Sequence, residues 1–190
     1  MARVGVAVRF GVLGAIAVWR GGAPVDVGHA RQRWVLGALL ADADGVVPTD
    51  VLVDRVWGAD APGRQALYGY VSRLRQVLSG VGADIVRDNG GYRLKVLAGS
   101  VDAHRFRDLA DQARAVRDDE QAASLWEEAL GLWRGDAFAG IDTLVQRPAC
   151  PAGRGATGCA AGSGGGTVTA WAARPDPRRM LDASGGVSAR

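Results

Sequence analysis

The side chains with the clearest chemical potential lie on one face of a helix predicted over residues 62–78. The apolar face of that helix is defined at helical spacing by Leu67, Val71, Leu74 and Leu78. The opposite face and its flanks carry amide, hydroxyl and guanidinium groups, at Arg64, Gln65, Tyr68, Gly69, Ser72, Arg73, Arg75 and Gln76. No carboxylate occurs between Asp60 and Asp84. A helix in the major groove of DNA needs donors for base edges and cations for phosphates, whereas a solvated face usually mixes Glu with Arg. We therefore favour a recognition helix over a merely solvated one.

A second set of cations follows in a predicted β-hairpin. Its strands are residues 85–87 and 92–96, and the turn contains Asn89-Gly90, a pair that readily takes positive φ. The hairpin contributes the side chains of Arg87, Arg93 and Lys95. Three helices followed by a basic hairpin is the element order of a winged helix-turn-helix.

The elements that must position this surface come earlier in the chain. Period-two alternation of apolar residues over 4–10 and 16–27 predicts a small antiparallel sheet. A helix over 31–40 and an extended piece over 46–48 follow. Thr49 or Asp50 is expected to cap the next helix through a side-chain oxygen, and its expected buried face is Leu52, Val53, Val56 and Trp57.

The apolar run from Phe10 to Trp19 has a second interpretation. Arginines flank it, and Ala15-Ile16-Ala17 imitates a cleavage site, so a signal peptide is the alternative to strands. The run is too short for a membrane span, which needs about 20 residues. Because alternation continues on both sides of the run, we expect strands and a cytoplasmic protein with no membrane partner.

Composition and charge narrow the classes of function. The 190 residues carry a net charge of +3, with 48% hydrophobic and 23% charged residues, which is an ordinary globular composition. The charge is uneven: residues 1–97 hold 12 basic and 8 acidic side chains, and residues 98–142 hold 5 basic and 10 acidic ones. The basic first segment suits an anionic partner such as DNA.

The sequence also lacks the groups that enzymes and metal sites require. With two cysteines, Cys150 and Cys159, and two histidines, His29 and His104, it offers no metal cluster and no catalytic triad. A G-x-G-x-x-G pattern at 153–158 follows no predicted strand, so it does not indicate a dinucleotide site. We expect no enzyme activity, no catalytic residues, no metal and no cofactor.

The acidic segment, residues 98–142, is predicted to form a tetratricopeptide-like helix pair broken at Asp118-Asp119. Its apolar stripes are Phe106, Leu109, Ala113 and Val116, then Ala122, Leu125, Trp126, Ala129, Leu132 and Trp133. One such pair cannot bury its own face, so it must pack on the winged helix or on a partner. Residues 143–190 are rich in Gly, Pro, Ala and Arg without periodicity, and we expect them to be disordered, following a change of reading frame near residues 142–145.

Several ordered landmarks resemble one known family. They are Phe10-Gly11-Val12-Leu13-Gly14, Arg31-Gln32-Arg33, Val53-Asp54-Arg55-Val56-Trp57-Gly58, Tyr70-Val71-Ser72-Arg73-Leu74-Arg75 and Gly91-Tyr92-Arg93-Leu94. Two more follow, Val101-Asp102-Ala103-His104-Arg105-Phe106 and Ala129-Leu130-Gly131-Leu132-Trp133-Arg134-Gly135. Together they resemble the OmpR-type winged helix and bacterial transcriptional activator domain of the AfsR/DnrI/RedD antibiotic regulatory activators, the SARPs.

The resemblance implies a pathway-specific activator of antibiotic genes that binds direct repeats in promoter DNA, in pairs, and recruits RNA polymerase. It implies an α+β fold in which a winged helix-turn-helix over 1–97 precedes a partial activator domain over 98–142 and a tail over 143–190. Family members commonly carry Gln-Thr where this chain has Tyr68 and Gly69. A truncated, non-activating competitor for DNA and a helical protein-interaction adaptor are the alternative functions.

Overall fold

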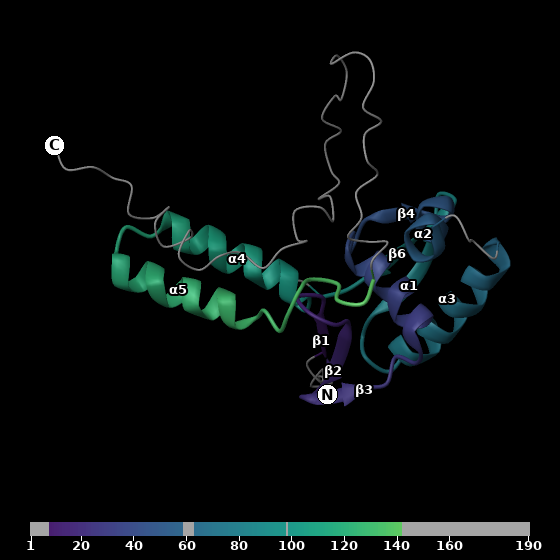
Figure 1. Ribbon diagram of the computed structural model, residues 1–190, viewed down its shortest axis with the longest axis horizontal. Coiled ribbons are helices and arrows are strands. Elements are labelled where there is room, and N and C mark those ends of the chain that lie inside the picture. Colours follow the sequence, from purple (N-terminus) through teal and green to yellow (C-terminus); the bar gives the residue numbers. More distant parts are fainter. Residues whose placement is uncertain (1–7, 59–62, 98, 142–190) are drawn as a thin grey trace, which may run out of the picture.

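The computed structural model describes residues 8–58, 63–97 and 99–141, and its helices and strands follow the predicted order (Figure 1). The first part contains β1 (Val8–Gly11), β2 (Ala17–Arg20), β3 (Ala23–Val25), α1 (Ala30–Leu40), β4 (Val46–Pro48) and α2 (Thr49–Trp57). The second contains α3 (Arg64–Leu78), β5 (Asp84–Asp88), β6 (Gly91–Lys95), α4 (Asp102–Ala115) and α5 (Asp119–Gly131). The predicted tail, with Cys150, Cys159 and the glycine pattern at 153–158, lies outside the described residues.

The N-terminal apolar run forms strands, as its alternation predicts. β1, β2 and β3 make an antiparallel sheet in that order, with Phe10 opposite Val18 and Val18 opposite Val25. Phe10 and Val18 are buried, whereas Arg9, which precedes Phe10 in β1 and pairs with Trp19, is exposed. Among the described residues, no helix is long and apolar enough to cross a membrane.

The winged helix is built on α1, which packs against both α2 and α3 (Figure 1). Its second sheet has the order β4-β6-β5, so the extended piece 46–48 is the third strand of the wing and not an isolated segment. The wing turns through Asn89 and Gly90, both at positive φ (42° and 78°), as the Asn-Gly pair predicts.

The predicted cap of α2 is wrong. Pro48 occupies the N-cap position, and no side chain caps the helix. The Thr49 hydroxyl instead donates to the carbonyl of Gly90 at 2.7 Å, which ties the start of α2 to the wing turn. Pairing of β4 with β6 carries Thr49 to this turn, and that pairing is not visible in the local sequence.

The helices α4 and α5 lie side by side and extend away from the winged helix (Figure 1). Asp118 caps α5 by accepting a hydrogen bond from the Gln121 amide at 2.8 Å, which explains the predicted break. The base of this helix pair packs on β1, and one hydrophobic core runs from the winged helix into it. The pair therefore buries its apolar face partly against the winged helix of its own chain.

Candidate nucleic-acid interface

The packing of α3 turns its polar face outward. Its apolar stripe is fully buried against α1 and the wing, with Leu67, Leu74 and Leu78 at 0% exposure and Val71 at 1%. On the far side of the helix lie the exposed residues Gln65, Gly69, Ser72, Arg73 and Gln76. The apolar residues of α3 are spaced by four, three and four positions. This spacing buries one face of the helix and so exposes the amide and hydroxyl groups on the other.

Gly69 leaves an open position in the middle of this face. A Cβ built at Gly69 would meet no atom within 4 Å, so neither packing nor backbone conformation requires a glycine there. A partner can approach the helix backbone closely at this point.

The wing lies beside α3 on the flank that holds Tyr68. The guanidinium carbon of Arg87, on β5, is 6.0 Å from the centre of the Tyr68 ring. Arg75, about two turns further along α3, donates from Nε to the carbonyl of Ile85 at 2.7 Å, and its guanidinium carbon lies 5.9 Å from the centre of the Tyr92 ring. The helix and the wing therefore form one continuous surface, and Arg75 is partly engaged in joining them.

Two other predicted cations have carboxylate partners. Arg64 donates from Nε and Nη2 to the two oxygens of Asp50, both at 2.9 Å, in a well-exposed pair. Arg93 donates to Asp88 at 2.6 Å and to the Asp44 carbonyl at 3.1 Å, so it stabilises the wing. The sequence between Asp60 and Asp84 contains no carboxylate, but the fold brings Asp50 of α2 next to Arg64 at the start of α3.

The remaining predicted cations are Arg73 and Lys95, both exposed. The Arg73 guanidinium carbon lies 5.7 Å from the ring of Tyr70, on the flank of α3 that faces away from the wing. Tyr70 also contacts His29 edge-on, with ring centres 5.3 Å apart, and Trp57 at 5.8 Å. No local sequence pattern indicates this aromatic group, because His29 precedes α1, Trp57 ends α2 and Tyr70 lies on α3.

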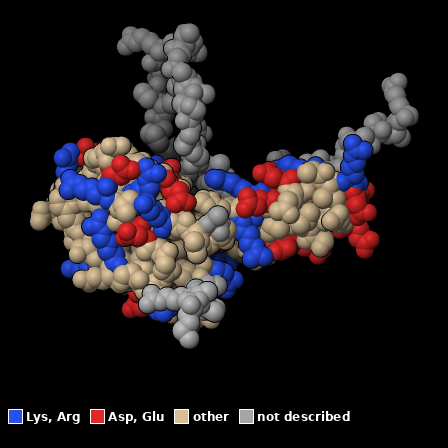
Figure 2. Space-filling model, turned by 180° about the vertical axis from the view of Figure 1, so that it is seen from behind, with Lys and Arg blue, Asp and Glu red and all other residues tan. Residues whose placement is uncertain are grey.

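Figure 2 shows Lys and Arg spread over the winged-helix half with fewer Asp and Glu among them, whereas acidic residues gather at the outer end of the helix pair. This matches the division of charge between residues 1–97 and 98–142. The surface of α3 and the wing is therefore the better candidate for an anionic partner.

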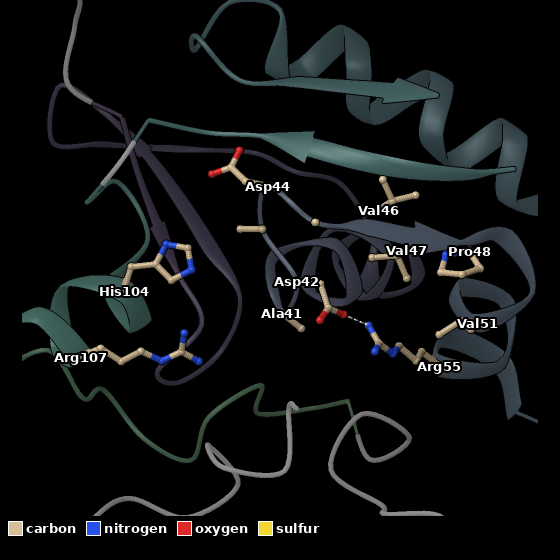
Figure 3. Close-up of a pocket in the computed structure, with 12 residues that line it drawn as sticks. Ala41, Asp42, Asp44, Val46, Val47, Pro48, Val51, Arg55, His104 and Arg107 are labelled. Atoms are coloured by element: carbon tan, nitrogen blue, oxygen red, sulfur yellow. Dashed lines mark hydrogen bonds and ion pairs between the residues drawn. The ribbon is translucent and has the colours of Figure 1, made fainter. Parts of the chain in front are cut away.

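A cavity of about 650 Å³ lies where α1, α2 and β4 meet α4 (Figure 3). Asp42 and Arg55 form an ion pair on its wall, and His104 and Arg107 enter it from α4. Burial lowers the pKa of His104 below its ordinary value, and the charge of Arg107 lowers it further, against an opposite effect of Asp44. His104 lies in the first turn of α4, at the junction of the winged helix and the helix pair.

The comparisons with known proteins agree with this architecture. Residues 101–155 match the family model of the bacterial transcriptional activator domain. Regulatory protein AfsR of Streptomyces coelicolor is 39% identical over 142 residues, which is 71% of this chain and 14% of AfsR. Transcriptional regulator RedD of the same species is 31% identical over 144 residues, 70% of this chain and 41% of RedD.

A solved structure of Mycobacterium tuberculosis EmbR, in complex with a low-affinity phosphopeptide, superimposes with a TM-score of 0.65 at 31% identity. It covers 72% of this chain, which spans 38% of EmbR. The fold is thus that of a winged-helix regulator with an attached activator domain. Over the matched residues the chain is similar to the SARP-type regulators AfsR, RedD and DnrI, which are named as regulatory proteins, and it spans only part of the length of each.

Proposed function

We propose that this chain is a sequence-specific DNA-binding transcriptional regulator that places α3 in the major groove and the β5–β6 wing on the adjacent backbone or minor groove. The observation that carries the proposal is the joint surface on which Arg87 of the wing lies against Tyr68 of α3, beside an outward row of polar side chains. A helix of this diameter fits the major groove of B-form DNA.

Within this surface, we assign the neutral polar side chains to base contacts and the cations to phosphate contacts. Gln65, Ser72 and Gln76 are exposed and neutral, so they suit hydrogen bonds to base edges. Gly69 permits close approach of the helix backbone at the centre. Tyr68 can donate a hydrogen bond from its hydroxyl at the edge near the wing.

The cations fall into two groups. Arg73, Arg87 and Lys95 are exposed and suit phosphate contacts on the two sides of the groove. Arg75 and Arg93 join the helix and the wing, so we assign them mainly to positioning. Arg64 reaches phosphate only if it exchanges Asp50 for a new acceptor, which at so exposed a pair costs little.

The partners follow from the class of protein. We propose promoter DNA with tandem direct repeats, occupancy by two copies and contact with RNA polymerase through the helix pair, in the cytoplasm, at genes of secondary metabolism. The named regulators AfsR and RedD support this assignment. Because the chain spans 14% of AfsR and 41% of RedD, activation is tested separately from DNA binding.

The test is a gel-shift titration at two salt concentrations. One duplex carries a tandem repeat from a promoter beside the gene for this protein, and the other has the same bases in scrambled order. Preference for the repeat at the higher salt is the expected result, because base contacts persist when counterion release weakens. Equal binding to both duplexes would reduce the proposal to non-specific DNA binding. A folded protein that binds neither duplex would overturn it in favour of the adaptor function.

A reporter assay run beside chromatin occupancy then separates an activator from a competitor. Occupancy with transcription above background supports polymerase recruitment. Occupancy without transcription identifies a non-activating competitor for the same sites.

A further inference from the structure

The loop that follows β1 presents two successive backbone amides to one carboxylate from a distant part of the chain. The amide of Val12 donates to Oδ1 of Asp102 at 2.8 Å, and the amide of Leu13 donates to Oδ2 at 3.1 Å. Asp102 is the first residue of α4. A carboxylate that takes one amide on each oxygen satisfies both donors and fixes its own orientation toward the loop.

A guanidinium from the segment that follows α5 completes the same arrangement. Arg134, which follows α5, donates from Nη2 to Oδ2 of Asp102 at 3.2 Å and from Nη1 to the carbonyl of Ala15 at 3.0 Å. Its guanidinium carbon lies 4.9 Å from the centre of the Trp19 ring on β2. One arginine therefore contacts α4, the loop after β1 and the N-terminal sheet.

The backbone after α5 runs along this same loop. The amide of Arg134 donates to the carbonyl of Leu13 at 2.8 Å, and the amide of Phe138 donates to the carbonyl of Val12 at 2.8 Å. The amide of Ala139 donates to the carbonyl of Gly14 at 3.1 Å. The start of α4 and the segment after α5 are thus both attached to residues 12–15, at the base from which the helix pair extends (Figure 1).

The Asp102 carboxylate is largely shielded from solvent. The Asp102 side chain is 13% exposed and that of Arg134 is 35% exposed. A buried carboxylate is tolerated only when its lone pairs are filled, and removing one partner costs more than an exposed pair would. Apolar packing could hold the two parts together, but it has no directionality, whereas two amides and a guanidinium define the direction of the first turn of α4.

We propose that Asp102 is a positioning residue that fixes the orientation of the α4–α5 pair relative to the winged helix, with Arg134 as its counter-ion. The proposal concerns the geometry of the free protein. Its consequence for a regulator, that the helix pair is held at a set angle to the DNA-bound α3, rests on the function proposed above.

The direct test measures distances between the two parts by double electron–electron resonance. Spin labels are placed at two exposed positions, Asp54→Cys on α2 and Gln121→Cys on α5, in the full chain with Cys150→Ser and Cys159→Ser. The parent protein should give a narrow distance distribution. Asp102→Ala should shift or broaden it, because the start of α4 loses its directional contacts.

The matched control is Asp111→Ala, which removes a carboxylate of α4 whose partner, Arg114, is an exposed neighbour on the same helix. Asp111→Ala should leave the distribution unchanged. Should Asp102→Ala fail to fold by circular dichroism, Asp102→Asn carries the test, since its amide group keeps one acceptor and opposes the second backbone donor. An unchanged distribution in a folded Asp102 variant would overturn the proposal.

Amide hydrogen exchange provides a second measurement, at the Val12 and Leu13 amides that donate to Asp102. Exchange at Val12 and Leu13 should accelerate roughly tenfold or more in Asp102→Ala, as expected for the loss of hydrogen bonds to a charged group. Exchange in α3 should stay unchanged, which separates local release from general loss of stability. Equal acceleration throughout the chain would mean that Asp102 has only a structural role and would contradict the proposal.

The gel-shift experiment keeps this proposal distinct from the proposed function. If Asp102→Ala alters the distances and the protein binds no DNA in any form, the positioning role stands and the regulatory function fails. If the parent binds the repeat and the distances do not respond to Asp102→Ala, the positioning role fails alone.

Discussion

Arg87 of β5 lies over the ring of Tyr68 of α3, with 6.0 Å between the guanidinium carbon and the ring centre. This contact brings the wing and the outward face of the third helix into one surface. Arg75 strengthens the same junction from within α3 by donating to the carbonyl of Ile85. The predictions for DNA binding therefore differ between residues that face outward and residues that hold the surface together.

Gln76→Glu should weaken binding to the repeat duplex by roughly ten- to a hundredfold, because it places a carboxylate on the exposed face of α3 near phosphates and base edges. Stability should hardly change at so exposed a position. The measurement is a gel-shift titration with thermal unfolding of the same samples. Gln112→Glu, the same change at an exposed position on α4, is the control and should bind normally.

Arg87→Ala should reduce the salt dependence of binding by about one unit in the slope of log K against log salt, as expected when one phosphate contact is lost. Preference for the repeat over the scrambled duplex should remain. Arg114→Ala removes an exposed arginine of α4 and should leave the slope unchanged. A loss of sequence preference in Arg87→Ala would instead place Arg87 among the groups that read bases.

The sequence predicts those parts of this site that depend on short-range pattern. The four-three-four spacing of Leu67, Val71, Leu74 and Leu78 defines both the helix and its outward face, and Asn89-Gly90 defines the wing turn. The apolar periodicity also breaks between α4 and α5, at Asp118, which caps α5. In each case the residues that determine the structure lie within a few positions of one another.

The long-range contacts could not be predicted in this way. The partner of Arg64 comes from α2, and Arg93 also reaches the carbonyl of Asp44, so both contacts follow from tertiary geometry. The joining of β4 to β6 takes Thr49 away from its expected capping role. Asp102 and Val12 are 90 positions apart, so no local pattern links them.

The stability of the protein should fall as the pH drops below the ordinary histidine pKa near 6.5, and His104 should account for part of the fall. Burial lowers the pKa of His104 in the folded state, so between that lowered pKa and the ordinary one the unfolded chain binds more protons. Stability therefore rises with pH through this window. Urea unfolding at about pH 5 and about pH 7.5 measures the difference.

His104→Gln should reduce the pH dependence of the unfolding free energy over this window. The control is His29→Gln, which removes the other histidine at an exposed position and leaves His104 in place, so the pH dependence should persist. An identical slope in His104→Gln and the parent would show that His104 titrates alike in the folded and unfolded chains.

Gly11→Ala should destabilise the fold by about 1–3 kcal/mol through crowding at the base of the helix pair. A Cβ at Gly11 would overlap with Nη2 of Arg134 and would lie 2.8 Å from Cζ3 of Trp19. A shift of Nη2 away from Gly11 would disturb its contact with Asp102, so the crowding and the loss of the ion pair are coupled.

A double-mutant cycle with Arg134→Ala measures this coupling. Arg134→Ala alone should destabilise the protein, but in its presence Gly11→Ala should cost less, because the nearer of the two crowded neighbours is gone and the Trp19 ring remains. Thermal or urea unfolding of the four proteins gives the interaction energy. Strict additivity would mean that the Arg134 guanidinium does not occupy the space beside Gly11 in solution, and it would weaken the case that Arg134 holds Asp102 in place.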